Sequence, residues 1–207
     1  MYARSTTVRG DPQTLGQGID YVRDEVMPLV RGMDGCMGLS MLCDRTTGRC
    51  IITTSWETEE AMRDSADGVR ASRARAAEIF GDADPEVQEW EIAVMHRMHE
   101  AHNGARTRVI WGRRGTDQMD RSLEDFRTGM LPRIEELPGF CSLSLMVDRL
   151  DGRTATAVTY DSPDAMMRAN DLATALREEF SRSLGMEITA VAEFDLVLAH
   201  LRVPETV

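Results

Sequence analysis

The stretch Asp44-Arg45-Thr46-Thr47-Gly48-Arg49 recurs 104 residues later as Asp148-Arg149-Leu150-Asp151-Gly152-Arg153, and this duplicated motif decides the fold. The same shift superposes further identical pairs on both sides of the motif: Pro28/Pro132, Gly35/Gly139, Leu39/Leu143, Ser40/Ser144, Gly81/Gly185 and His96/His200. One register kept over so much of the chain indicates an internal duplication. We therefore predict two repeats, residues 1–98 and 105–207, joined by a polar linker at residues 99–104.

Each repeat shows the order strand, helix, strand, strand, helix, strand. Strands are indicated by alternating or β-branched runs, and helices by apolar residues spaced three and four apart. The predicted elements are 5–9, 15–33, 37–43, 50–56, 58–81 and 90–96 in the first repeat, and 107–111, 119–137, 141–147, 154–160, 162–185 and 194–200 in the second. Pro28 and Pro132 lie inside the first helical stripe, so we expect a kink or a second short segment there.

The βαββαβ order is that of a ferredoxin-like unit, in which helices cover one face of an antiparallel sheet. The other face is apolar and must also be covered, because it would otherwise expose a large hydrophobic patch. Two such units in one chain can cover each other. The predicted fold class is therefore α+β, with two tandem repeats forming an intrachain pseudo-twofold α+β barrel.

Composition excludes several classes of function. The formal net charge of -11 argues against nucleic acid or an anionic membrane as partner, since both require a basic surface. All 24 basic residues are arginine, so lysine Schiff-base chemistry and the P-loop lysine are excluded. No apolar run has the length of a signal peptide or a membrane span, which predicts a cytoplasmic protein.

The predicted compartment favours thiols for the four cysteines, Cys36, Cys43, Cys50 and Cys141. Cys43 and Cys50 flank the first hairpin loop, however, and can face each other across it. A disulfide between these two residues therefore stays open at this point.

Three stretches resemble the antibiotic biosynthesis monooxygenase family of the dimeric α+β barrel superfamily. They are Pro138-Gly139-Phe140 before a strand, Asp148 to Gly152 at the hairpin, and Trp56-Glu57-Thr58-Glu59-Glu60-Ala61-Met62 before a helix. The resemblance covers both repeats. It implies a cofactor-independent monooxygenase, or a related enzyme, that acts on an aromatic polyketide-like molecule. The alternative is a non-catalytic protein of the same fold that binds a small apolar or aromatic ligand or serves as an accessory protein.

The haem-degrading branch of this fold needs an Asn on the first strand and an axial His on the second helix. Neither first strand contains Asn, and no His occurs between Glu57 and Met95 or between Asp161 and His200. A haem iron would lack its axial imidazole. We therefore expect no haem and no other cofactor.

Four residues are candidates for catalysis. Trp56 matches a strand-three tryptophan of the family, and Tyr160 occupies its place in the second repeat, so each can offer an N–H or O–H donor to an oxyanion. His96 and His200 are a histidine pair preserved by the repeat and can serve as the base. The competing interpretation places the two aromatic residues in the core and the two histidines at strand ends.

Ser40, Ser142 and Ser144 point away from the apolar rows of their strands and can line a ligand site. Met37 and Trp111 complete the predicted substrate-binding set. Histidines 96, 99 and 102 are spaced by three, but they run into a glycine-containing linker without further ligands, so we predict no metal. Which repeat holds a working pocket, and whether the protein is a monomer or a homodimer, stays open.

Overall fold

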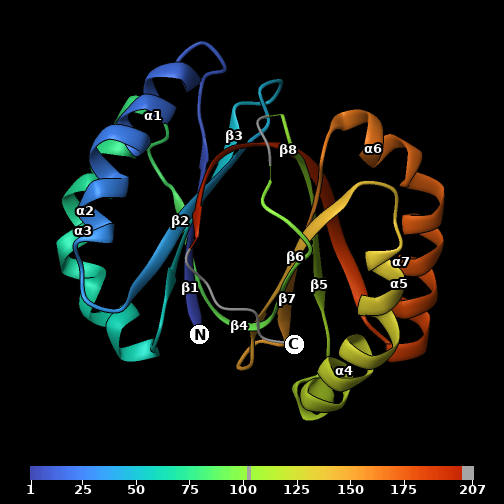
Figure 1. Cartoon of the computed structure of the whole chain (residues 1–207). Helices are drawn as coiled ribbons and strands as arrows, with labels where there is room; N and C mark the ends of the chain where they lie inside the picture. Colours follow the sequence, from blue (N-terminus) through green and yellow to red (C-terminus); the bar gives the residue numbers. More distant parts are fainter. Residues whose placement is uncertain (102–103, 202–207) are drawn as a thin grey trace. The chain divides into compact units, whose positions relative to one another are not determined.

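The computed structural model describes residues 1–101 and 104–201 and shows an α+β fold with helices between strands (Figure 1). The first repeat contains β1 (Tyr2–Arg9), α1 (Leu15–Tyr21), η1 (Val22–Val26), α2 (Met27–Arg31), β2 (Cys36–Cys43), β3 (Arg49–Trp56), α3 (Glu59–Phe80) and β4 (Glu86–Arg97). The second contains β5 (Arg106–Arg113), η2 (Thr116–Gln118), α4 (Met119–Asp125), η3 (Phe126–Met130), α5 (Leu131–Glu135), β6 (Phe140–Asp148), β7 (Arg153–Tyr160), α6 (Pro163–Arg168), α7 (Asn170–Leu184) and β8 (Glu187–Leu201). The prediction of two tandem ferredoxin-like repeats is confirmed.

The strands pair antiparallel, and the central strand of each repeat has a partner on either side. In β3, Ile52 lies opposite Thr6 of β1 and Met41 of β2. In β7, Thr156 lies opposite Ile110 of β5 and Leu145 of β6. The end of β8 also pairs with β2, with His200 opposite Leu39, and β4 pairs with β6, with His96 opposite Leu143.

The described residues divide into two compact units, residues 1–90 with the end of β8 from Phe194, and residues 91–193. Each unit has its own apolar core. In the first, side chains from β1, β2, β3 and the helices pack around Leu39, Met41 and Phe80. In the second, the corresponding elements pack around Phe126, Leu143 and Tyr160.

The first helix of each repeat is interrupted just before its proline. The π-helical segments η1 and η3 precede Pro28 and Pro132, which are the second residues of α2 and α5. Proline has no N–H to donate to the preceding turn, and a widened turn accommodates the missing hydrogen bond. The predicted second short segment is confirmed.

The second helices begin and end where their caps predict. Thr58 Oγ1 accepts a hydrogen bond from the Ala61 backbone N–H at 3.0 Å, and Ser162 Oγ accepts one from Ala165 at 3.1 Å. Gly81 and Gly185 close the helices in the left-handed conformation. The sequence did not predict that the second copy is divided into α6 and α7. Within residues 1–101 and 104–201, no helix combines the length and apolar character needed to cross a membrane.

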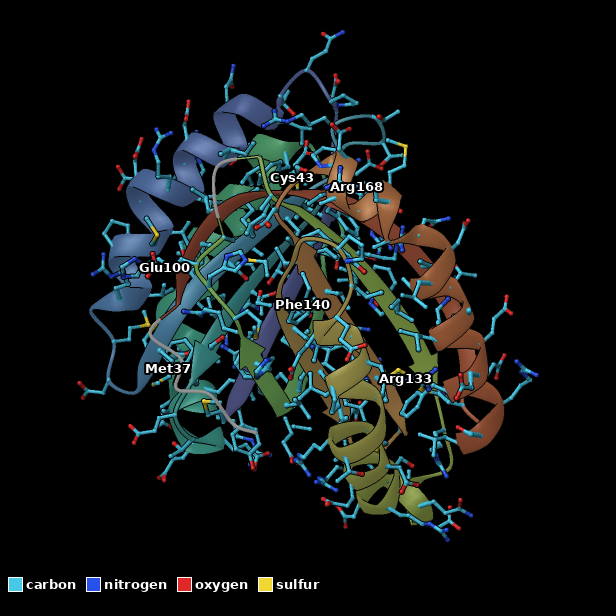
Figure 2. All side chains as sticks on the ribbon, turned by 45° about the vertical axis from the view of Figure 1, so that its right-hand side comes forward. Met37, Cys43, Glu100, Arg133, Phe140 and Arg168 are labelled. Carbon is cyan, nitrogen blue, oxygen red and sulfur yellow. A yellow bond between two sulfur atoms is a disulfide. The ribbon has the colours of Figure 1, made fainter. Side chains whose placement is uncertain are left out.

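Cys43 and Cys50 are joined by a disulfide, which answers the question that the sequence left open for this pair. Cys43 ends β2 (Figure 2) and lies directly opposite Cys50 of β3, with 4.3 Å between their Cα atoms. The hairpin register brings both sulfurs to one face of the sheet. The preference for thiols had relied only on the predicted cytoplasmic compartment. Cys36 and Cys141 are free.

Replacing both Cys43 and Cys50 by alanine is expected to lower the free energy of unfolding by about 2 kcal/mol, because the unfolded chain loses a cross-link that closes a short loop. Urea denaturation with and without a thiol reductant measures this. The reductant should destabilise the wild type and a Cys36→Ala control by the same amount. A wild type that is indifferent to reductant throughout the unfolding transition would contradict the assignment.

Candidate functional site

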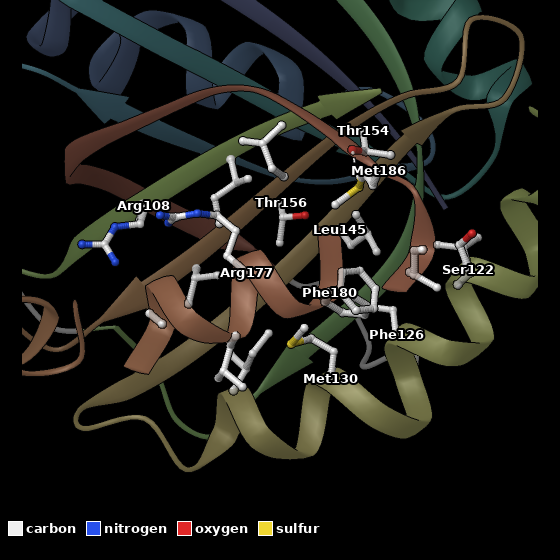
Figure 3. A pocket seen from close by; sticks show the side chains of 18 of the residues that line it. Arg108, Ser122, Phe126, Met130, Leu145, Thr154, Thr156, Arg177, Phe180 and Met186 are labelled. Atoms are coloured by element: carbon white, nitrogen blue, oxygen red, sulfur yellow. Dashed lines mark hydrogen bonds between the residues drawn. The ribbon is translucent and has the colours of Figure 1, made fainter. Parts of the chain in front are cut away.

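A cavity of about 80 Å³ lies in the second unit between the sheet and the helices that cover it (Figure 3). Its sheet side is built from Ile110, Leu145 and Thr156, three residues that are opposite one another in register and therefore share one face. Successive side chains of a strand point to opposite faces of the sheet, so every second residue points to this face. The strand pattern of the second repeat thus produces an apolar floor.

The helices provide the other wall of this cavity. Phe126, Met130 and Ile134 recur every four residues and form one stripe across η3 and α5. Phe180 of α7 meets Phe126 edge-to-face, with ring centroids 5.3 Å apart. Ala173 of α7 also lines the cavity, and its small side chain leaves room there.

A few polar groups interrupt the apolar lining. Arg108 and Arg177 lie on one side of the view in Figure 3, and Ser122 and Thr154 lie on the other. Tyr160 lines the cavity too, and burial raises the pKa of its phenol. Among the residues that the structure describes, no histidine, aspartate or glutamate lines this cavity. The cavity therefore offers hydrogen-bond donors and positive charge but no side-chain base.

The first unit has a cavity of about 50 Å³ at the equivalent place. Most of its lining residues correspond to those of the second unit through the 104-residue shift, including Arg4 for Arg108 and Arg73 for Arg177. Val69 stands where the second unit has Ala173. The larger of these two cavities therefore belongs to the second repeat.

Of the predicted catalytic residues, Tyr160 lines the larger cavity and Trp56 lines neither. Trp56 is completely buried, and its indole Nε1–H donates a hydrogen bond to Thr54 Oγ1 at 3.0 Å. That is the geometry of a core residue with a satisfied polar group.

The two predicted histidine bases lie outside both cavities. His96 Nε2 is 3.1 Å from Glu135 Oε1, and the imidazole stacks on Phe140 (Figure 2) with 6.2 Å between centroids and an interplanar angle of 11°. His200 lies opposite Leu39 in the β2–β8 ladder, and its Nε2 is buried without a hydrogen bond. The structure does not bring His96 or His200 to the residues that line the cavities.

The predicted substrate-binding residues also lie away from the cavities. Ser142 and Ser144 are half-buried and alternate with the buried Leu143 and Leu145, so they occupy the sheet face opposite the cavity. The remaining members of the set, Ser40, Met37 and Trp111, are half-buried and line neither cavity.

Sequence reasoning missed Arg108 and Arg177. The signal was present, because Arg4 and Arg73 occupy the equivalent positions of the first repeat. The sequence therefore already contained two arginines, one on a predicted strand and one on a predicted helix, that are identical in both repeats.

One group of side chains has the donor types of a metal site. His99, Cys141 and Asp161 offer ligand atoms that all lie within 4.8 Å of one another. Cys141 Sγ is 3.7 Å from His99 Nδ1, and His99 Nε2 is 3.5 Å from Asp161 Oδ1. Burial raises the pKa of the Cys141 thiol, the charge of Asp161 raises it further, and the thiol is therefore protonated at neutral pH. Of the two histidines considered with His99 in the sequence, His96 does not belong to this group, and His102 lies outside the described residues.

Comparisons with known proteins identify close relatives in Mycobacterium tuberculosis strain H37Rv. The chain is 50% identical over 207 residues to uncharacterized protein Rv2557, covering all of this chain and 92% of the relative. It is 51% identical over 208 residues to uncharacterized protein Rv2558, covering all of this chain and 88% of the relative. No protein-family model matches the chain.

Among solved structures, an anthrone oxidase-like protein superposes with a TM-score of 0.67 at 12% identity, covering 99% of this chain and 94% of the other. A ferredoxin-fold protein of Listeria monocytogenes related to antibiotic biosynthesis monooxygenases superposes with a TM-score of 0.52 at 9% identity, covering 94% of both chains. At these identities the likeness establishes the fold. The chain therefore has the tandem ferredoxin-like fold of the antibiotic biosynthesis monooxygenase-like proteins, and it belongs to the family of the mycobacterial proteins Rv2557 and Rv2558.

Proposed function

We propose that the protein binds a narrow apolar small molecule in the cavity of its second unit. The observation that carries this proposal is the cavity itself, which is lined mainly by aliphatic and aromatic side chains with a few polar groups. Ligand sites have this composition, because the apolar walls supply affinity and the polar groups fix orientation.

The size of the cavity narrows the ligand class. Its volume of about 80 Å³ is below the ~150 Å³ of an engineered cavity that holds benzene. A fused aromatic polyketide is larger than benzene, whereas an unbranched alkyl chain has a smaller cross-section than an aromatic ring and can enter such a cavity with part of its length. The cavity therefore favours a chain-like ligand over the aromatic polyketide that the family resemblance implied.

The lining also favours binding over oxygenase chemistry at this place. A cofactor-independent oxygenase must remove a proton from its substrate, and the cavity offers Tyr160 as its titratable neutral group. Because burial raises the pKa of Tyr160, the phenol keeps its proton and acts as a donor.

Filling the cavity provides the test. In isothermal titration calorimetry with 1-octanol, we expect Ala173→Leu to weaken binding by about ten-fold or more, since the added side chain takes the space of the ligand. The matched control is Val69→Leu, which fills the equivalent position of the first unit and should leave the affinity unchanged. The proposal fails if the wild type binds no octanol, or if the two variants weaken binding equally.

Oxygenase activity is the second candidate, and two observations favour it. The fold is shared with an anthrone oxidase-like protein, and His96 Nε2 lies 3.1 Å from the carboxylate of Glu135. In this proposal Trp56 and Tyr160 donate to the oxyanion and His96 or His200 is the base. Oxygen uptake with a dihydroxyanthrone tests it. Equal rates for the wild type and the Trp56→Phe/His96→Ala variant would exclude this site.

A further inference from the structure

Two arginines at one end of the larger cavity are not explained by binding of an apolar chain. Arg108 comes from β5 and is 4% exposed. Its Nε and Nη2 donate to Glu193 Oε1 at 3.1 and 2.7 Å, and Nη2 also donates to Asn170 Oδ1 at 3.0 Å. Its Nη1 is buried and donates no hydrogen bond. One donor of this guanidinium is thus without an acceptor among residues 1–101 and 104–201.

Arg177 of α7 lines the same cavity and is half-buried. Its Nη2 donates to Thr174 Oγ1 at 3.3 Å, and in the part of the chain that the structure describes no carboxylate forms an ion pair with it. Burial lowers the pKa of Arg177, and the nearby charge of Arg108 lowers it further, against smaller opposite effects of Glu178 and Tyr160. Two like charges therefore share the end of an apolar cavity.

The carboxylate of Glu193 lies beside these two arginines and forms an ion pair with Arg108. Among the described residues at this end of the cavity, one positive charge is left without an ion-pair partner, next to a donor without an acceptor. Arg114 also lines the cavity, and its Nη1 is likewise buried without a hydrogen bond. Burial of uncompensated charge is unfavourable, so an arrangement of this kind indicates an anion that binds there.

The first unit repeats the arrangement independently. Arg4 forms an ion pair with Glu89 at 2.7 Å, as Arg108 does with Glu193. Arg73 corresponds to Arg177, and its Nη2 is buried without a hydrogen bond. Burial and then the charge of Arg4 lower the pKa of Arg73. The two repeats have diverged at many positions of the lining, yet both keep two arginines and one glutamate at this end of the cavity.

We propose that the ligand is an apolar monocarboxylic acid with an unbranched chain, whose carboxylate lies between Arg108 and Arg177 while its chain enters the cavity. This inference rests on the proposed function and names its ligand class. A guanidinium binds a carboxylate with parallel hydrogen bonds, so the unused Nη1 of Arg108 gains an acceptor. One excess positive charge matches one carboxylate rather than a phosphate, which carries about two negative charges near neutral pH.

Two ligands with the same alkyl chain, one charged and one neutral, separate the contribution of the carboxylate from that of the alkyl chain. In calorimetry at neutral pH, octanoate should bind about ten-fold or more tightly than 1-octanol, since a hydrogen bond to a charged group contributes about 1.5 to 3 kcal/mol. Arg177→Gln should abolish this preference, by weakening octanoate binding much more than octanol binding. Arg177→Lys should restore part of the preference, because it restores the charge without the planar donor pair.

The matched control is Arg73→Gln, which removes the equivalent arginine of the first unit and should leave both affinities unchanged. Equal binding of octanoate and octanol by the wild type would overturn this inference and leave the proposed function standing. Binding of neither ligand would overturn both. A preference that depends on Arg73, or on Arg114, which directly follows β5 and also lines the larger cavity, would overturn the assignment of the carboxylate to Arg177.

Discussion

Replacing Trp56 by alanine is expected to lower the free energy of unfolding by about 3 to 5 kcal/mol, the range for a large aromatic residue removed from a core. Trp56 is completely buried, it lies opposite Tyr2 and Cys36 in the sheet of the first unit, and its indole N–H is satisfied by Thr54. Truncation removes the packing and leaves the Thr54 hydroxyl without this donor. Chemical denaturation followed by circular dichroism measures the change.

Leu150→Ala is the control for this prediction. Leu150 is 91% exposed in the second hairpin, so its truncation should change the free energy of unfolding by less than about 0.5 kcal/mol. If Trp56→Ala also costs less than about 1 kcal/mol, Trp56 is not a core residue. Its role as a donor to an oxyanion would then gain support, because a wall residue of a ligand site can be removed at small cost.

Local signals in the sequence were sufficient for the fold. Asp148 Oδ1 accepts backbone hydrogen bonds from Leu150 at 3.0 Å and Asp151 at 3.2 Å, as a hairpin aspartate does. Thr58 and Ser162 cap the second helices, and the burial of β6 alternates as its residues predict. These features depend on a few neighbouring residues. They occur twice in one chain, so each copy supports the interpretation of the other.

The site was less accessible from the sequence, because alternation tells which residues share a sheet face but not which face bounds a cavity. Ser142 and Ser144 were assigned correctly to one face of β6, and the cavity formed on the other face, under the helices. The cavity depends on the volume of single residues such as Ala173 against Val69. Periodicity carries no information about such differences in volume.

Arg177 on α7 shows a second reason why the site was difficult to predict from the sequence. Arg177 stands in the polar run Arg177-Glu178-Glu179, where a charged helix face in solvent is the ordinary interpretation. Only its correspondence to Arg73, together with that of Arg108 to Arg4, separates it from that run. An internal duplication can therefore serve as a comparison of two related sequences, and residues kept at equivalent positions in both copies are candidates for function.

Replacing Gly152 by alanine is expected to lower the free energy of unfolding by about 3 to 4 kcal/mol. Gly152 has a φ of 66°, a left-handed conformation that costs a residue with a Cβ atom about 1 to 2 kcal/mol. A Cβ at this position would also lie 1.9 Å from the Arg114 carbonyl oxygen. The Arg114 N–H donates to the Gly152 carbonyl at 2.8 Å, so the two backbone segments are tied together and must separate, at a further cost of about 2 kcal/mol. Urea denaturation of the purified variant measures the sum.

Gly185→Ala separates the two contributions to this cost. Gly185 has a φ of 62°, and a Cβ there would have no heavy atom within 4 Å, so the variant should lose only about 1 to 2 kcal/mol. Gly48→Ala should behave like Gly152→Ala, because Gly48 has a φ of 74° and its added Cβ would lie 2.0 Å from the Gly10 carbonyl oxygen. If Gly152→Ala costs no more than Gly185→Ala, the hairpin does not approach Arg114 as closely as the structure shows. If the Gly48 and Gly152 variants instead lose very different amounts of unfolding free energy, the backbone segments packed against the two hairpins are not equivalent, even though Asp44 to Arg49 and Asp148 to Arg153 share one motif.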